Sequence, residues 1–329
     1  MEIRDLKSVL CFLTLSDLKN ISFILDVNLH GNRKKADVIN ILAEQMSKKS
    51  VFERTYLSLS DREVDFLNRL VDNQISFGNI DSKQLEVLMI FGYAYADENG
   101  AILSDVLVDY FKSIDEKLEK QRGHLANIDK YFNCFVNLYG MIPIEKAAML
   151  YNRYEKDKMV PDDLEGLFGR ANSFENDYTF VCGYLTHQVI VMLDEEPGGA
   201  IDYYLTNQKG KDYAVLPKRE LLKYIDADYF EKTSQYKKVV TMLSLELGLS
   251  KKDAEELGKT LGVMARNGVN FDAVFAELEK YDAAFESMEQ ADKFVSAYAD
   301  LVNNTRMWEN CCYTPTQMRT MDGNIKVRK

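Results

Sequence analysis

The chain has 329 residues, of which 46% are hydrophobic and 28% are charged. These proportions are typical of a folded protein with a sizeable buried core, and they exclude wholesale disorder. The formal net charge is -11, so the surface as a whole repels nucleic acid, and any such contact needs a local basic patch.

The apolar stretches of the chain match neither a secretory signal nor a membrane-spanning helix. The run SVLCFLTL between Lys7 and Asp17 has no basic head and no small-residue cleavage site, so it does not match a secretory signal. The longest uncharged stretch, Tyr178–Leu193, is shorter than the roughly 20 apolar residues that a spanning helix needs. We therefore expect a cytoplasmic protein without membrane contact, and its odd, mostly isolated cysteines predict reduced thiols.

Residues 1–50 are predicted to form two or three short helices. Leu18, Ile21 and Leu25 share one helical face, and a second helical pattern follows a turn at residues 29–32. The layout SDLKxI…L-V…G…KKAxVIxxL resembles the Rho N-terminal and SAP-like helical modules. That resemblance implies a small unit of a kind that often binds nucleic acid.

The segment GNRKK, Gly31–Lys35, is the candidate nucleic-acid site. Its three adjacent cations, Arg33, Lys34 and Lys35, stand at a predicted helix start, where backbone amides suit a phosphate. Lys and Arg outnumber Asp and Glu by 8 to 6 within residues 1–50. The alternative interpretation is a solvated turn without a ligand.

Residues 54–114 resemble a winged helix in the order of their elements. A capping box at Ser60 and Glu63, with Leu59 and Val64 as its hydrophobic staple, predicts a helix start. A second helix, a hairpin around Glu98-Asn99-Gly100 and a final helix complete the order. The candidate recognition helix SKQLEVLMIF carries one Lys and one Glu, which favours a scaffold over a DNA reader for this module.

Residues 124–228 are predicted to form a second winged-helix-like module of α+β type. Pro143 and Pro161 suit the first turns of two helices. The stretches YTFVCGYLTHQVIVML (178–193) and AIDYYLTNQKGKDYAVL (200–216) are rich in aromatic and β-branched residues, which predicts strands. A helical C-terminal domain, 229–329, follows. The expected fold is therefore mainly α with small β-hairpins, in several modules.

Near the C-terminus, NTRMWENCCYTPTQM raises the question of a metal site, a redox site or a structural element. Zinc needs three or four ligands, usually as two close pairs, and no Cys, His or Glu follows Cys311-Cys312. A vicinal pair is also not the spacing of thiol oxidoreductases. Thr314 as N-cap with Pro315 after it predicts a helix start, so the structural interpretation is favoured. We expect no metal and no cofactor.

This segment resembles the N-T-x-x-W-x-N-x-G-[HY]-T-P-x-E stretch of bacterial proteins that carry a C-terminal SEC-C zinc motif. The resemblance implies a body plan with helical and winged-helix-like regions rather than an activity. Cys312 stands where the family has Gly, and the zinc motif is missing, so metal binding is not implied. The matching residues, which we interpret as a structural motif, are Asn304, Thr305, Trp308, Asn310, Thr314 and Pro315. We expect Trp308 to be buried as a wedge beside the last helices.

No catalytic centre is predicted. The three histidines, His30, His124 and His187, are scattered, and no phosphate-loop, dinucleotide, zinc-protease or nucleophile-elbow motif is present. Asp226, Asp228 and Glu231 lack the spacing of an EF-hand, although they offer oxygen ligands to a cation. Two functions remain open: a non-enzymatic regulatory or adaptor protein that contacts nucleic acid through its N-terminal module, or a protein–protein interaction scaffold without nucleic-acid binding.

Overall fold

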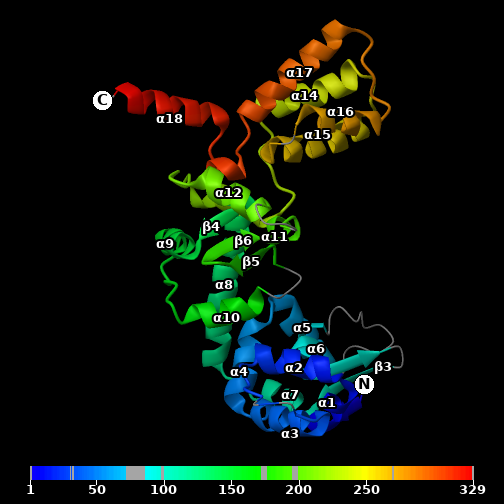
Figure 1. Cartoon of the computed structure of the whole chain (residues 1–329), viewed down its shortest axis with the longest axis vertical. Helices are drawn as coiled ribbons and strands as arrows, with labels where there is room; N and C mark the ends of the chain where they lie inside the picture. The colour runs from blue at the N-terminus through cyan, green and yellow to red at the C-terminus, as the bar shows by residue number, and fades with distance from the viewer. Residues whose placement is uncertain are drawn as a thin grey trace. The chain divides into compact units, whose positions relative to one another are not determined.

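The structure is a computed structural model (Figure 1) that describes residues 2–29, 31, 33–71, 86–97, 100–171, 176–194, 199–268 and 270–327. Helices account for 65% and strands for 7%, with small three-stranded sheets, so the mainly α fold is confirmed. Within these residues no helix combines the length and the apolar character needed to cross a membrane.

The chain divides into two compact units. Unit 1 comprises residues 1–130 and 155–179, and unit 2 comprises residues 131–154 and 180–329. The predicted boundaries of the four modules, 1–50, 54–114, 124–228 and 229–329, remain predictions, as does the winged-helix resemblance.

Unit 1 is a set of mostly short helices around one hydrophobic core that extends from Leu6 to Leu118 along the chain. Its helices are α1 (Leu6–Phe12), α2 (Leu15–Ile24), α3 (Lys35–Met46), α4 (Lys49–Ser58), α5 (Asp61–Val71), α6 (Glu86–Ile90), α7 (Asp105–Phe111), the first part of α8 (Glu116–Tyr139) and α10 (Asp163–Arg170). Its strands are β1 (Glu2–Arg4), β2 (Ala94–Asp97) and β3 (Gly100–Ser104).

Local signals place the start of α5 as predicted. The Glu63 amide donates to the Ser60 hydroxyl at 3.2 Å, and the Ser60 amide donates to the Glu63 carboxylate at 2.6 Å. Leu59 and Val64 on either side are both buried. The predicted capping box is therefore confirmed, because its reciprocal bonds satisfy two amides that the helix leaves without a partner.

The sheet of unit 1 has the strand order β1-β3-β2. Strands β2 and β3 pair antiparallel, with Ala94 opposite Leu103, as the hairpin prediction expects; its turn residues Glu98 and Asn99 lie outside the described residues. The parallel pairing of β1 with β3, in which Glu2 faces Ile102, was not predicted. The start of the chain thus joins the sheet of residues 94–104.

Unit 2 contains the end of α8, a small sheet and a helical region. The sheet, ordered β4-β6-β5, consists of β4 (Met141–Pro143), β5 (Tyr178–Val181) and β6 (Tyr184–His187), and the first two residues of β5 fall within the range of unit 1. Around and after it come α9 (Ile144–Tyr154), α11 (Gln188–Met192), α12 (Ala200–Gln208) and α13 (Lys218–Leu221). The helices α14 (Ser234–Leu245), α15 (Lys251–Arg266), α16 (Phe271–Glu279) and α17 (Met288–Asn303) share one core, and α18 (Pro315–Val327) ends the described chain (Figure 1).

The prediction of strands over residues 200–216 is wrong. Residues 200–208 form α12, and no strand follows up to residue 217. Ile201, Tyr204 and Leu205 recur at helical spacing and pack against the cluster that contains Trp308. Side-chain packing on one helical face therefore outweighs the β-propensity of the aromatic residues. The preceding stretch is strand only through His187, after which α11 begins.

Candidate functional site

The C-terminal motif forms the turn between α17 and α18. The Gln317 amide donates to the Thr314 hydroxyl at 3.1 Å, and the Thr314 amide donates to the Gln317 side chain at 2.9 Å. Helix α18 begins at Pro315, so the predicted helix start is confirmed. At the other end, the Thr305 hydroxyl donates to the Leu301 carbonyl at 2.8 Å, which closes the last turn of α17.

Trp308 is buried, as expected, with 5% of its surface exposed. Its indole Nε1 donates to the Asn137 carbonyl at 3.1 Å, and its ring centroid is 5.0 Å from that of His187. Gly140, in a left-handed conformation, lies directly against the ring, because a Cβ at this residue would be 2.7 Å from an indole carbon. Trp308 thus fastens the motif to the end of α8.

The two adjacent cysteines adopt an unusual backbone. Cys311 and Cys312 have φ values of 49° and 72°, in the left-handed region that residues other than Gly rarely occupy. Cys312 donates its amide hydrogen to the Met307 carbonyl at 3.0 Å. A tight turn explains why Gly suits this position, and both thiols are fully buried.

Burial raises the pKa of the Cys311 thiol to about 11 and that of Cys312 to about 12. We therefore expect Cys11 and Cys182, which are exposed, to react quickly with a thiol reagent at about pH 8, and Cys134, Cys311 and Cys312 to react only after unfolding. Counting the cysteine thiols that react in native and in denatured protein checks this, and fast labelling of Cys311 or Cys312 in the native protein would contradict it.

The raised pKa values of Cys311 and Cys312 also make stability depend on pH. Because these thiols ionise at a lower pH in the unfolded chain than in the folded one, the free energy of unfolding falls as the pH rises above about 9.

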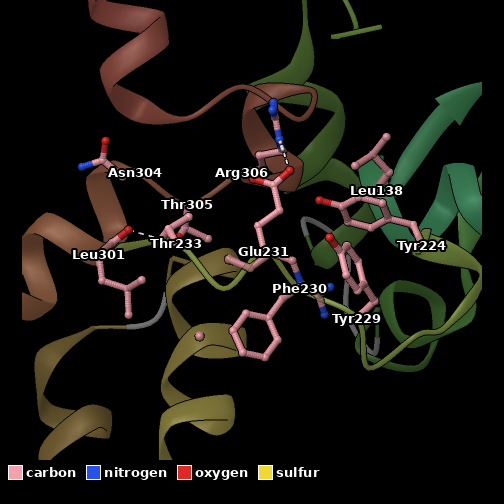
Figure 2. Close-up of a pocket in the computed structure, with 12 residues that line it drawn as sticks. Leu138, Tyr224, Tyr229, Phe230, Glu231, Thr233, Leu301, Asn304, Thr305 and Arg306 are labelled. Carbon is pink, nitrogen blue, oxygen red and sulfur yellow. Dashed lines mark hydrogen bonds and ion pairs between the residues drawn. The ribbon is translucent and has the colours of Figure 1, made fainter. Parts of the chain in front are cut away.

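A small pocket of about 30 Å³ lies beside the motif in unit 2 (Figure 2). Arg306 and Glu231 form an ion pair there, with Nε and Oε1 3.0 Å apart, and Arg306 Nη1 donates to the Cys312 carbonyl at 3.1 Å. Asn304 and Thr305 of the predicted motif line the pocket (Figure 2). The other lining residues are Leu138, Tyr224, Tyr229, Phe230, Thr233, Gly262, Arg266 and Leu301.

The carboxylates of Asp226, Asp228 and Glu231 do not gather around a common point. Glu231 pairs with Arg306, and Asp226 accepts a hydrogen bond from the Asp228 amide at 3.0 Å. Over the described ranges, no three His, Cys, Asp or Glu side chains are grouped as metal ligands. The cation interpretation of these residues therefore gains no support.

The candidate nucleic-acid residues lie at the start of α3. Arg33, Lys34 and Lys35 are exposed, and Lys34 is an N-cap whose side chain makes no capping hydrogen bond. The Lys35 ammonium donates to the Cys11 carbonyl at 2.7 Å, near the end of α1. A cation at a helix C-terminus stabilises the helix, so Lys35 already has a structural role.

The described histidines have structural partners. His124 lies 2.8 Å from the Asp157 carboxylate and 3.1 Å from the Asp163 carboxylate. His187 Nδ1 accepts a hydrogen bond from the Val189 amide at 3.1 Å and so caps α11. His30 lies outside the described residues, as does the first part of the predicted recognition helix.

A larger pocket in unit 1, of about 490 Å³, was not predicted. We call it the groove; it is lined by residues of α2, α4, α8 and α10 and by the adjoining loops. Phe23, Ile24 and Phe168 in its lining are 87%, 39% and 48% exposed. Phe23 lies off the buried Leu18–Ile21–Leu25 face of its helix. An aromatic residue at such a position is the feature of the sequence that could have indicated the groove.

The charged residues that line the groove are predominantly acidic. Among the described lining residues Arg54 is the one cation, and its Nη1 lies 3.4 Å from the Glu165 carboxylate. The acidic residues of the lining are Asp26, Asp162, Asp163 and Glu165.

Glycines bring α10 close to its neighbours at the base of the groove. A Cβ at Gly169 would be 1.9 Å from the Ser58 hydroxyl, and a Cβ at Gly166 would be 2.5 Å from Leu125. The walls of the groove therefore depend on small residues at two helix contacts.

Comparison with known proteins gives no match to a family model, to a curated protein or to a solved structure.

Proposed function

We propose that this protein is a non-enzymatic adaptor that binds a partner protein through the groove of unit 1. The observation that carries the proposal is the exposed aromatic lining: Phe23 and Phe168 together with Ile24 leave a large apolar surface open beside a recess. Contiguous exposed apolar surface of this kind is typical of interaction sites. A volume of about 490 Å³ is enough for one or two apolar side chains of a partner.

The charged residues of the groove indicate which kind of partner segment it binds. The described lining contains four carboxylates and one guanidinium; the guanidinium is paired with Glu165, and the Asp163 carboxylate lies 3.1 Å from His124. A basic residue next to the apolar anchors of the partner is therefore favoured, and an acidic segment or a nucleic acid is disfavoured at this site. The partner segment that fits is an amphipathic peptide with aromatic or aliphatic anchors and a flanking Lys or Arg.

Nucleic-acid contact through Arg33, Lys34 and Lys35 is the second candidate function. The exposed cations and the N-terminus of α3 without a side-chain cap support it. The bond from Lys35 to Cys11 and the net charge of -11 weigh against it.

A peptide selection on the full-length protein separates the two functions. We expect selected peptides to carry apolar anchors with a neighbouring basic residue, and to lose at least about tenfold in affinity on Phe168→Ser or Phe23→Ser, as truncated hot spots do. The matched control is Leu245→Ser, because Leu245 is 80% exposed but lies outside the groove. Phe23 is so exposed that its replacement leaves the core intact, which thermal melting checks.

Two outcomes would overturn this proposal. One is a set of peptides whose binding is unaffected by both Phe substitutions. The other is wild-type binding to nucleic acid with a log–log salt slope of about -2 to -3, abolished when Arg33, Lys34 and Lys35 are all replaced by Ala, because three phosphate contacts give such a slope. That result, without peptide binding, would assign the function to the N-terminal segment.

A further inference from the structure

We propose that the pocket beside Arg266 in unit 2 binds a small carboxylate anion, with the Arg266 guanidinium as its counter-ion. This site is separate from the groove, and the inference does not depend on the adaptor function. It rests on three features of the pocket: a mostly buried arginine that has no acidic partner, the charge balance of the lining, and the size of the space.

Arg266 is the last residue of α15, and its side chain is mostly buried. Its Nε atom is inaccessible to solvent and has no hydrogen-bond partner among the described residues. On one side the guanidinium carbon lies 5.4 Å from the centroid of the Trp308 ring. Within the described part of the chain, no carboxylate lies within ion-pair distance of Arg266.

Burying a guanidinium without a partner is costly, because a charge that leaves water needs an ion pair or hydrogen bonds in exchange. Burial accordingly lowers the pKa of Arg266, an effect that nearby Tyr224, Tyr204 and Asp228 oppose. The aromatic face of Trp308 offsets part of the cost through a cation–π contact. The Nη atoms also have no hydrogen-bond partner among the described residues, and they are the part of the guanidinium that an acceptor from outside the chain can reach.

The lining of the pocket has one positive charge in excess. Among the described residues of the lining, the cations are Arg266 and Arg306, and the one carboxylate is Glu231. Glu231 is already paired with Arg306 at 3.0 Å (Figure 2). A monovalent anion at Arg266 would neutralise the pocket. A doubly charged phosphate would reverse the excess instead of cancelling it.

Size and shape favour a carboxylate. A space of about 30 Å³ is far below the roughly 300 Å³ at which pockets for drug-sized ligands begin, so only a small group fits. The planar guanidinium fork matches the two oxygens of a carboxylate, and this pairing is stronger than a hydrogen bond between neutral groups. Tyr229 and Phe230 supply apolar walls that suit a short aliphatic tail, as in acetate (Figure 2).

Trp308 makes the test direct, because it is the single tryptophan of the chain and lies against Arg266. The experiment is a titration of the full-length protein with sodium acetate, at ionic strength held constant with the sodium salt of a bulky sulfonate that is too large for the pocket, followed by Trp308 emission. We expect a saturable change in the wild type that is lost in Arg266→Met. The control Arg219→Met removes an exposed arginine of unit 2 outside the pocket and should leave the titration unchanged.

Arg266→Lys keeps the charge but not the fork, so we expect at least about a tenfold weaker response; this variant also decides the matter if Arg266→Met fails to fold. Sodium phosphate in place of acetate should bind at least about tenfold more weakly, because of its size and charge. A wild-type signal that does not saturate would overturn the inference, as would saturation unchanged in Arg266→Lys. Tighter binding of phosphate than of acetate would overturn the assignment to a carboxylate.

Discussion

Replacing Arg170 with Met is expected to destabilise unit 1 by about 3–5 kcal/mol, the usual cost of removing one partner of a buried ion pair. Arg170 is 2% exposed, and its Nε lies 3.4 Å from the Asp129 carboxylate. Its Nη1 donates to the Leu57 carbonyl at 3.0 Å and to the Leu59 carbonyl at 2.6 Å. The substitution leaves a buried carboxylate without its cation and two carbonyls at the end of α4 without their donor.

The cost should depend on pH in a definite direction. Burial raises the pKa of Asp129, and Arg170 opposes this rise. Without Arg170 the folded-state pKa of Asp129 rises further above its unfolded value. The free energy of unfolding of the variant is therefore highest where Asp129 is protonated, and it decreases as the pH increases and the buried carboxyl must ionise. We therefore expect the difference from the wild type to be smaller under mildly acidic conditions than at neutral pH.

Urea unfolding of the wild type and the variant at both pH values measures this effect. The matched control is Arg54→Met, because Arg54 forms an exposed ion pair with Glu165 at 3.4 Å, and such pairs contribute about 0–1 kcal/mol. Equal losses in the two variants would mean that the Arg170 network contributes no more than a surface pair.

Replacing Trp308 with Ala is expected to cost about 3–5 kcal/mol, the range for deleting a buried aromatic side chain. The indole is 5% exposed and packs with Met141 and Ile190. In the wild type we expect blue-shifted emission and weak acrylamide quenching, with a red shift on unfolding, because this single tryptophan reports its own site. Native emission at the fully solvated wavelength would contradict the buried position.

Two glycine variants isolate the contact between Trp308 and the end of α8. Gly140 and Gly183 both have positive φ, at 71° and 84°, so Ala at either position strains the backbone. Only at Gly140 does the added Cβ meet the indole, at 2.7 Å, whereas nothing lies within 4 Å of a Cβ at Gly183. We expect Gly140→Ala to be the more destabilising of the two and to shift Trp308 emission. Equal losses of stability in the two variants would mean that the indole moves aside at no measurable cost.

The candidate sites predicted from the sequence are local segments, whereas the two pockets of the structure combine residues far apart in the chain. The cations of residues 33–35 do precede a helix, yet the engagement of Lys35 by the Cys11 carbonyl arises only from the packing of α3 against α1. The pocket at Arg266 combines side chains of α15, the segment before α14 and the C-terminal motif. No spacing within the sequence relates these segments, so neither this pocket nor the groove was predicted.

The sequence by itself determined the features that depend on residues close together in the chain. The capping box at Ser60, the helix start at Thr314 and the hairpin of residues 94–104 formed as predicted, because side chain and backbone meet within one turn or one pair of strands. The tertiary structure alone decided the pairing of β1 with β3, the helical state of residues 200–208 and the burial of Arg170. In each of these cases the free energy comes from groups far apart in the chain, whose contacts local propensity does not encode.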